Sequence, residues 1–230
     1  MKRTGGSDEA KRRAGEAAAD RVTDGEIVGL GTGSTAAHAI RALGRSVDSG
    51  LDIRGVPTSF QSRDLAREVG IPLTTLDEAT PDVAIDGADE VAGFDLMKGG
   101  GAAHAREKYV ASAADRFLVV ADDSKLTDAL AGPVPVELLP DARAPVAAAI
   151  REVGGEPTLR AAERKDGPVV TDNGNLVFDC AFEEIDPESL APTLSAIPGV
   201  VEHGLFVGLA DAVLVGRADG VERRVPPLSE

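Results

Sequence analysis

The sequence contains no tryptophan, and aromatic residues make up only 3% of its 230 positions. Proteins that hold single-stranded nucleic acid without sequence preference stack its bases on aromatic side chains, so this composition argues against such a platform. The hydrophobic content of 43% is nevertheless ordinary, and Val, Leu, Ile and Ala must therefore build the core. A chain of this length forms one large domain, or a main domain with a smaller second one.

Cysteine is nearly absent as well. Cys180 is the only one, so no disulfide can form within the chain, which is typical of proteins in a reducing compartment. Because Cys180 lies in the strand-like segment 175–182, we interpret it as a small buried hydrophobic residue and not as a nucleophile. No apolar run approaches the roughly 20 residues of a membrane span, and residues 1–8 lack the apolar region of a signal peptide. The sequence therefore predicts a soluble, cytoplasmic protein without a membrane partner.

Lysine is scarce in a chain that is rich in acids. Six of the 24 basic residues are lysine, the acidic residues number 39, and the net charge is −15. Contacts to phosphate backbones need clustered Lys and Arg, so the sequence predicts no nucleic-acid partner. The composition favours a halophilic protein, in which concentrated salt screens the repulsion between like charges. An ordinary acidic enzyme is the alternative, and its stability would not rise between low and molar salt.

Short strands and helices alternate through the first half of the chain. The predicted strands cover 26–30, 52–56, 72–76, 82–86 and 116–122. The predicted helices cover 8–22, 59–69 and 102–114, with another that runs from the loop 31–35 to Leu43 and ends at Gly44. This alternation with short loops predicts βαβ units and a mainly parallel sheet.

The pattern changes near Gly132. Strands are predicted near 133–139, 157–160, 169–171 and 176–182, with helices near 144–153 and 187–196. The segments 204–207 and 212–216 then predict a return to the first domain. The expected fold class is therefore α/β, with a Rossmann-like parallel-sheet main domain (1–132 and 204–230) and a smaller inserted α+β domain (133–203).

A glycine-rich loop, Gly31-Thr-Gly-Ser-Thr35, joins the first predicted strand to a helix. Glycines let the backbone approach an anion, and the amides at a helix start favour negative charge. The pattern Gly31-x-Gly33-x-x-Ala36 also fits a dinucleotide fingerprint, but no acid ends the next strand where one would bind the ribose. A single phosphate on a small sugar fits better. A capped turn without any ligand is the alternative.

Two aspartates follow the apolar strand 82–86. Asp86 and Asp89 lie on either side of the turn Gly87-Ala88, at the kind of strand end where open α/β sheets collect ligands. Two such acids can handle hydroxyl protons, one accepting and the other donating if its pKa is raised. Acids also suit Mg²⁺, but no further ligands occur at clear spacing, so we predict no metal. A solvated turn is the alternative.

Lys98 stands directly before three glycines, 99–101. A cation beside exposed backbone amides can stabilise a developing oxyanion or enediolate. Glu107 follows on the first turns of the next predicted helix, where it is either a general base or a surface acid paired with a neighbouring cation. Lys125, after the strand 116–122, suits a phosphate or a sugar hydroxyl, with a surface lysine as the alternative.

Several ordered segments together resemble one family. They are Gly-Thr-Gly-Ser-Thr-Ala-Ala-His (31–38), Asp-Gly-Ala-Asp-Glu (86–90), Lys-Gly-Gly-Gly-Ala-Ala (98–103), Arg-Glu-Lys (106–108), Pro-Val-Glu (135–137) and Val-Thr-Asp-Asn-Gly-Asn (170–175). In this order they resemble the ribose-5-phosphate isomerases of type A, over nearly the whole chain from Lys11 to about Val221. The stretch between Glu90 and Lys98 is shorter than the family pattern, which bears on substrate preference and not on the reaction.

The resemblance implies an aldose–ketose isomerase that needs no metal or cofactor. Such an enzyme interconverts D-ribose 5-phosphate and D-ribulose 5-phosphate through an enediolate, in the non-oxidative pentose phosphate pathway. Glu107 would move the proton between C1 and C2, Asp86 and Asp89 would assist ring opening and hydroxyl proton transfer, and Lys98 would stabilise the enediolate. The substrate-binding positions that the resemblance implies are Lys11, Thr32, Gly33, Ser34, Thr35, Gly87, Ala88, Gly99, Gly100, Gly101 and Lys125. A homodimer or homotetramer is expected on the same ground.

Three other functions fit parts of the pattern. A sugar-phosphate-sensing regulator would keep the phosphate loop without a base, but it usually carries a basic DNA-binding module, and none is visible. A nicotinamide-dependent oxidoreductase would bind its cofactor at the glycine loop, which an absorbance titration detects. An acyl-CoA transferase of similar architecture would need a catalytic glutamate in another context, which the sequence does not offer.

Overall fold

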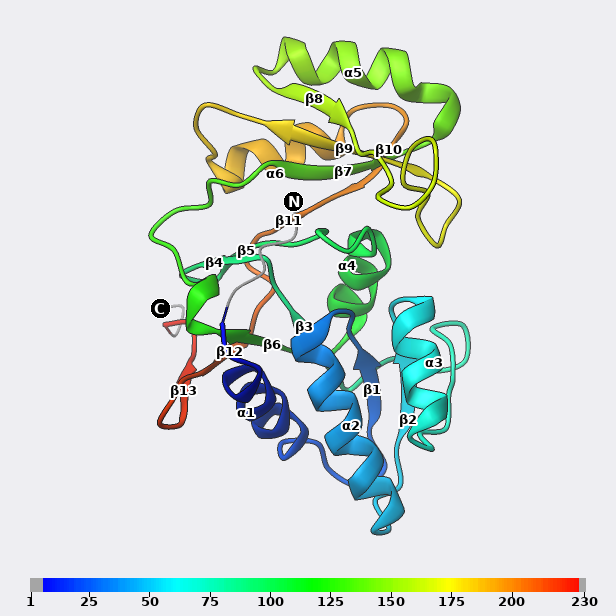
Figure 1. Cartoon of the computed structure of the whole chain (residues 1–230), viewed down its shortest axis with the longest axis vertical. Coiled ribbons are helices and arrows are strands. Elements are labelled where there is room, and N and C mark those ends of the chain that lie inside the picture. The colour runs from blue at the N-terminus through cyan, green and yellow to red at the C-terminus, as the bar shows by residue number, and fades with distance from the viewer. Residues whose placement is uncertain (1–5, 228–230) are drawn as a thin grey trace. The chain divides into compact units, whose positions relative to one another are not determined.

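A computed structural model describes residues 6–227, which fold as two compact units (Figure 1). The main unit comprises 6–88, 106–126 and 208–227, and the second unit comprises 89–105 and 127–207. Over these described residues, no helix has both the length and the apolar character that a membrane crossing requires.

The main unit is built on a six-stranded sheet in the order β13-β12-β6-β3-β1-β2. Its strands are β1 (Ile27–Leu30), β2 (Arg54–Pro57), β3 (Val83–Gly87), β6 (Arg116–Asp122), β12 (Ala212–Gly216) and β13 (Val221–Arg224). Neighbouring strands are parallel except β12 and β13, which are antiparallel. Because β1 and β12 are apolar and buried along their whole length, they suit a sheet that is covered on both faces. The predicted α/β class with a central parallel sheet is confirmed.

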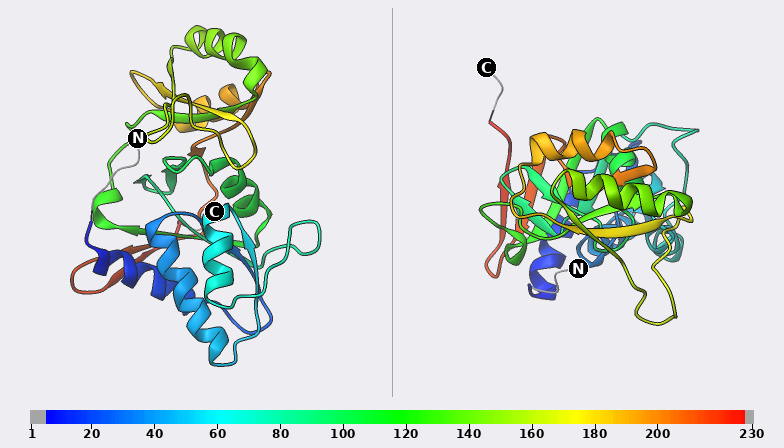
Figure 2. Two further views of the ribbon diagram at one scale, coloured as in Figure 1. Left: turned by 45° about the vertical axis from the view of Figure 1, so that its right-hand side comes forward. Right: turned by 90° about the horizontal axis from the view of Figure 1, so that it is seen from above.

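Helices cover both faces of this sheet (Figure 2). The first three are α1 (Asp8–Ala19), α2 (Ser34–Asp48) and α3 (Phe60–Glu68). Val28 and Leu30 of β1 share one core with Ala14 of α1 and Ile40 of α2. Gly29 points to the opposite face, since side chains alternate along a strand, and a Cβ there would lie 2.7 Å from Val110 of α4 (His104–Ala113).

The α2 helix is longer than predicted. We expected it to end at Gly44, but it continues to Asp48. Gly44 lies inside the helix. A Cβ there would come within 2.5 Å of the Val69 side chain, so this position needs glycine for close packing and not for a helix end. The helix predicted over 59–69 is confirmed as α3, and Ser59 is its cap: the Ser59 hydroxyl accepts from the Ser62 amide in a capping box.

The predicted strand 72–76 is wrong. Only an isolated parallel bridge between Gly55 and Leu73 forms there. Pro72 has no N–H to donate to a sheet ladder, and the following residues turn away from the edge strand β2.

The second unit combines two small antiparallel sheets with two helices. Its strands are β4 (Glu90–Ala92), β5 (Asp95–Met97), β7 (Val134–Leu138), β8 (Glu156–Leu159), β9 (Leu176–Ala181), β10 (Val200–His203) and β11 (Leu205–Phe206). They pair in the orders β10-β7-β9-β8 and β11-β5-β4. The helices α5 (Arg143–Glu152) and α6 (Pro187–Ser195) supply Ile150 and Leu194 to a core that includes Val136 and Phe178.

A buried carboxylate organises the turn 171–175 in this unit. Glu137 of β7 is completely buried, and its Oε1 accepts hydrogen bonds from Thr171 Oγ1 (2.9 Å), Asn173 Nδ2 (3.0 Å) and Asn175 Nδ2 (2.8 Å). The strand predicted over 169–171 is therefore wrong, because the chain forms a side-chain-anchored turn with only an isolated bridge between Ala161 and Pro168.

The boundary between the units differs from the one expected at 133–203. Residues 89–105 and 127–132 group with 133–207, because β4 and β5 pair with β11 and the Thr127 amide donates to Val91 O at 2.9 Å. The segment 204–207 likewise lies in the second unit, since Leu205 and Phe206 form β11. The assignment of 133–203 as a separate functional domain stays a prediction.

Candidate active site

Several loops of the main unit meet at one edge of its sheet. Because β2, β1, β3 and β6 are parallel neighbours, their carboxyl ends lie at the same edge, where open α/β sheets bind ligands. The ends of these strands and the segments that directly follow them contain the predicted residues 31–35, 86–88 and 125. The α4 helix leads into the opposite end of β6, so its first turn, which contains Glu107, also points toward this edge.

Asp86 lies at this edge on β3, the strand between β6 and β1. It is the fourth residue of β3 and only 3% exposed. Its Oδ1 accepts hydrogen bonds from the Thr32 amide at 2.9 Å and from the Gly87 amide at 2.7 Å. A Cβ on Gly31 would lie 2.3 Å from this carboxylate, so the glycine is required for the close approach of the loop to Asp86. The structure therefore joins two of the predicted motifs directly.

Thr32 connects the same loop to the start of α3. Its Oγ1 lies 2.8 Å from Thr58 Oγ1 and 2.7 Å from Ser59 Oγ, and Thr58 Oγ1 donates to Leu30 O at 3.1 Å. Sequence reasoning did not include Thr58 or Ser59 in the site. Their position directly after β2, at the carboxyl edge, is the signal that could have found them.

The start of α2 has no side-chain cap. Its N-cap is Gly33, whose φ of 107° is a left-handed conformation that favours glycine. Ser34 is the first helical residue and is exposed, whereas Thr35 is 8% exposed. Neither hydroxyl caps the helix, because glycine occupies the cap position. The amides at this helix start can consequently face an anion.

The predicted charged residues of the main unit lie on three different elements. Glu107 is 6% exposed on the first turn of α4, and Lys125 is 7% exposed in the short 3₁₀ helix Asp123–Lys125 directly after β6. Lys11 lies on α1 and is half-buried. Burial argues against the solvent-facing alternatives for Glu107 and Lys125, since such groups are rarely buried without a specific role.

The remaining predicted residues belong to the second unit. The Asp89 amide donates to Met97 O at 2.8 Å, and Asp89 Oδ2 accepts from the Gly100 amide at 2.7 Å. The Lys98 amide donates to Gly204 O at 2.8 Å, while its Nζ lies 5.4 Å from the centre of the Phe206 ring. Asp89 thus fixes the loop of glycines 99–101, and the Gly100 amide donates its hydrogen bond to Asp89.

An arginine that sequence reasoning missed holds the same loop. Gly99 has a φ of 103°, and its carbonyl accepts from the Ala102 amide at 3.0 Å and from Arg160 Nη1 at 2.7 Å. Arg160 also pairs with both carboxylate oxygens of Asp179 on β9. No local signal could have revealed Arg160, because 61 residues separate it from Gly99. Ala102 adopts a φ of 57°, which is uncommon for a non-glycine residue and typical of functional loops.

Among residues 6–227, no cluster of three or more His, Cys, Asp or Glu side chains is arranged to hold a metal ion. The expected metal-free and cofactor-free reaction stays a prediction.

The chain is similar to proteins of one family over nearly its whole length. The family model described as ribose 5-phosphate isomerase A (phosphoriboisomerase A) matches residues 54–220. A ribose-5-phosphate isomerase A of the haloarchaeon Natronomonas pharaonis is 71% identical over 225 residues, which cover 97% of this chain and 100% of the relative. This relative agrees with the salt adaptation predicted from the acidic composition.

Two solved structures share the fold. The ribose 5-phosphate isomerase A of Methanocaldococcus jannaschii superposes with a TM-score of 0.93 at 44% identity, covering 96% of this chain and 100% of that one. A D-ribose-5-phosphate isomerase in complex with phospho-erythronic acid gives a TM-score of 0.93 at 41% identity and the same coverage. The chain therefore belongs to the ribose 5-phosphate isomerase A family, and it is an aldose–ketose isomerase that interconverts ribose 5-phosphate and ribulose 5-phosphate.

Proposed function

We propose that this chain isomerises D-ribose 5-phosphate through an enediolate, with Glu107 as the base. The observation that carries the proposal is the carboxyl edge of the main sheet. A buried Asp86 is there hydrogen-bonded to the glycine loop, and the α4 turn that bears a buried Glu107 points to the same edge. Buried carboxylates at a ligand-binding edge are typical of general acid–base chemistry.

The phosphate of the substrate would bind at the start of α2. The glycine N-cap leaves the first helical amides without a side-chain cap, and the helix dipole favours an anion at this end. The backbone of Gly33 and the hydroxyls of Ser34 and Thr35 supply donors. Lys11 and Lys125 supply positive charge to the phosphate or a sugar hydroxyl, while Thr32, Gly87 and Ala88 line the sugar.

Catalysis would begin with ring opening, because the closed sugar has no acidic hydrogen at C2. Asp86, or Asp89, takes the proton from the hydroxyl at C1 and returns a proton to the ring oxygen. Glu107 then removes the C2 hydrogen, and the electron pair of the C–H bond forms the C1–C2 double bond while the C1 carbonyl becomes an oxyanion. Asp86 or Asp89 then moves the proton of the C2 hydroxyl to the C1 oxyanion. Protonation of C1 by the Glu107 carboxylic acid leaves the carbonyl at C2 and gives the ketose.

The enediolate would be stabilised by Lys98 and the amides of Gly99 and Gly101. Gly100 would contribute by fixing the loop, since its amide donates to Asp89. Stabilisation of an oxyanion in a preorganised site contributes about 10²–10³-fold, and general base catalysis contributes about 10²–10⁴-fold. The relative solved with phospho-erythronic acid supports this part of the proposal, because that ligand joins a phosphate to a carboxylate whose two oxygens resemble those of an enediolate.

Three further statements belong to the same proposal. The enzyme acts in the cytoplasm, in the non-oxidative pentose phosphate pathway, and it assembles as a homodimer or homotetramer. The single cysteine and the resemblance to the family support these statements. Sedimentation at equilibrium would test the assembly, and a purely monomeric protein at micromolar concentration would contradict it.

The experiment that tests the base compares Glu107→Gln with the wild type in an assay of ketose formation from ribose 5-phosphate, with chelator present. We expect kcat to fall about 10²–10⁴-fold with an unchanged melting temperature. Glu68→Gln, an exposed glutamate of α3, is the matched control and should keep full activity. A Glu107→Gln variant with near wild-type kcat would remove Glu107 from this role.

A further inference from the structure

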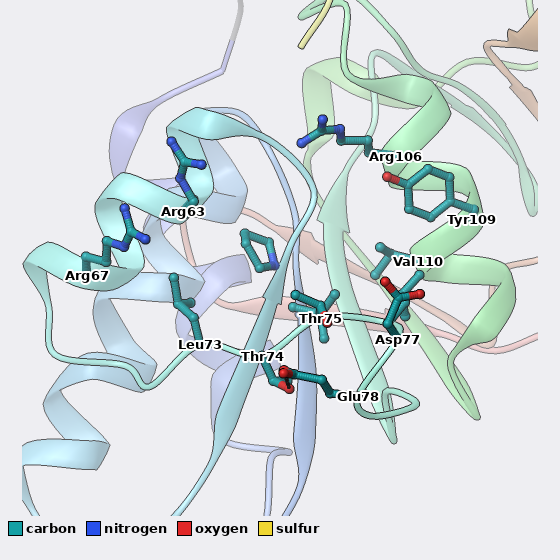
Figure 3. A pocket seen from close by; sticks show the side chains of 13 residues that line it. Arg63, Arg67, Leu73, Thr74, Thr75, Asp77, Glu78, Arg106, Tyr109 and Val110 are labelled. Atoms are coloured by element: carbon teal, nitrogen blue, oxygen red, sulfur yellow. Dashed lines mark hydrogen bonds between the residues drawn. The ribbon is translucent and has the colours of Figure 1, made fainter. Parts of the chain in front are cut away.

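A cavity of about 560 Å³ opens beside the edge strand β2 of the main unit (Figure 3). Residues of α3 and α4 line it from two sides, and the segment 73–78 lines it between them. Its volume lies within the range of small-molecule sites, about 300–1,000 Å³. None of its lining residues has a role in the isomerisation proposed above.

Three arginines line this cavity in a protein of net charge −15. The guanidinium groups of Arg63 and Arg106 lie 4.6 Å and 5.4 Å from the centre of the same Phe60 ring, which is 45% exposed. Two guanidinium groups therefore lie at one exposed ring beside the cavity, and both would attract an anion there.

Acids do not neutralise the α3 side of the cavity. Arg63 pairs only loosely with its neighbour Asp64, at 3.5 Å, and its Nε has no hydrogen-bond partner although it is buried. Arg67, one helical turn further on, makes no ion pair anywhere in residues 6–227. Guanidinium groups bind phosphate through paired N–H donors, so Arg63 and Arg67 offer a clamp for a phosphate group.

The opposite side suits a flat, partly apolar group. Figure 3 shows Tyr109 beside Arg106 on α4, across the opening from Arg63 and Arg67, with Asp77 nearby. Tyr109 is 49% exposed, and Val56, Leu73 and Val110 add apolar surface. The Asp77 carboxylate is exposed and can accept N–H groups, whereas the neighbouring Glu78 already accepts from Thr74 Oγ1 at 3.0 Å.

We propose that this cavity binds a purine nucleotide. Arg63 and Arg67 bind its phosphate, the base stacks on Tyr109, and N–H groups of the base donate to Asp77. A sugar phosphate lacks a planar face, so it would leave the aromatic and apolar side of the cavity unfilled. Binding is measured directly, and its outcome is therefore independent of the mechanism of isomerisation.

The test is calorimetric titration of the whole protein with guanosine 5′-monophosphate, at the salt concentration that gives full isomerase activity. We expect one saturable site. Inorganic phosphate and guanosine should each bind at least tenfold more weakly than the nucleotide, because each makes only part of the contacts. Loss of a hydrogen bond to a charged group weakens binding about 10–100-fold, so the double variant Arg63→Gln with Arg67→Gln should bind in that reduced range.

Matched variants make the result decisive. Arg41→Gln, an exposed arginine of α2 outside the cavity, should bind the nucleotide as the wild type does. Tyr109→Leu should weaken the nucleotide but not inorganic phosphate. Isomerase activity confirms that each variant is folded, and Arg67→Gln alone replaces the double variant if that one fails to fold. No saturable nucleotide binding, equally tight binding of inorganic phosphate, or binding that the arginine variants leave unchanged would each overturn the proposal.

Discussion

Substitution of Arg160 tests how the loop of glycines 99–101 is positioned. Its guanidinium group makes a bidentate pair with Asp179 and donates a third hydrogen bond to Gly99 O at 2.7 Å. Arg160→Lys keeps the positive charge, but a single ammonium group cannot hold both oxygens of Asp179 and also reach Gly99 in the same planar geometry. The substitution should therefore release the loop that bears Lys98 while leaving the charge of the region unchanged.

The expected magnitudes follow from the burial of the pair. The side chains of Arg160 and Asp179 are 12% and 22% exposed, so the pair is partly screened, and the loss of stability should be about 1–3 kcal/mol. A misplacement of catalytic groups by about 1 Å costs on the order of 10²-fold in rate. Because the loop is proposed to act on the enediolate, kcat should fall about 10–100-fold while KM changes little.

Arg151→Lys is the matched control. Arg151 pairs with Glu156 in the same unit, but at 3.6 Å and with both side chains more than half exposed, so its replacement should change neither kcat nor stability measurably. If Arg160→Lys lowered the melting temperature but kept the wild-type kcat, the contact to Gly99 would be purely structural. The proposed positioning role of Arg160 would then be wrong.

Three other outcomes are expected. Gly31→Ala places a Cβ 2.3 Å from the Asp86 carboxylate, so kcat should fall about 10²-fold, whereas Gly220→Ala, with open space around it, should be neutral in the same assay. Burial raises the pKa of the Cys180 thiol to about 12 from 9.0. Because the folded state keeps a proton that the unfolded chain loses, the free energy of unfolding should fall as pH rises from about 9 toward 12. Cys180→Ala should lack this decrease when unfolding is measured by circular dichroism. The melting temperature should rise between about 0.1 M and 1 M salt, where the Debye length shortens from about 10 to 3 Å; a melting temperature that stayed constant or fell would contradict salt adaptation.

Features that depend on local chemistry could be predicted from the sequence. The buried apolar runs of β1 and β3 identified two central strands, and the glycines and acids that follow them marked the carboxyl edge. The start of α3 was predicted correctly, because it depends on the Ser59 hydroxyl, which caps the helix within one turn. The position of Asp86 beside the loop 31–35 could thus be expected from strand ends.

Features that depend on packing between distant segments could not be predicted in this way. Gly44 resembles a helix end in sequence, yet it lies inside α2, where a side chain would clash with Val69. The pairing of β11 with β5, about 100 residues earlier in the chain, has no local signal in the sequence either. The hydrogen bond from Arg160 to Gly99 O likewise has no local sequence signal. Such contacts are set by tertiary structure, which overrides local pattern.

The central claim is that the hydrogen at C2 leaves as a proton and that an enediolate forms. The most direct test is to run the isomerisation of ribose 5-phosphate in D₂O to equilibrium, over many turnovers, and to locate deuterium by NMR. The account predicts deuterium at C1 of ribulose 5-phosphate and at C2 of ribose 5-phosphate, with incorporation slowed in step with kcat in Glu107→Gln. Full conversion without any solvent deuterium at these carbons would indicate a direct hydride shift and would contradict the proposed mechanism.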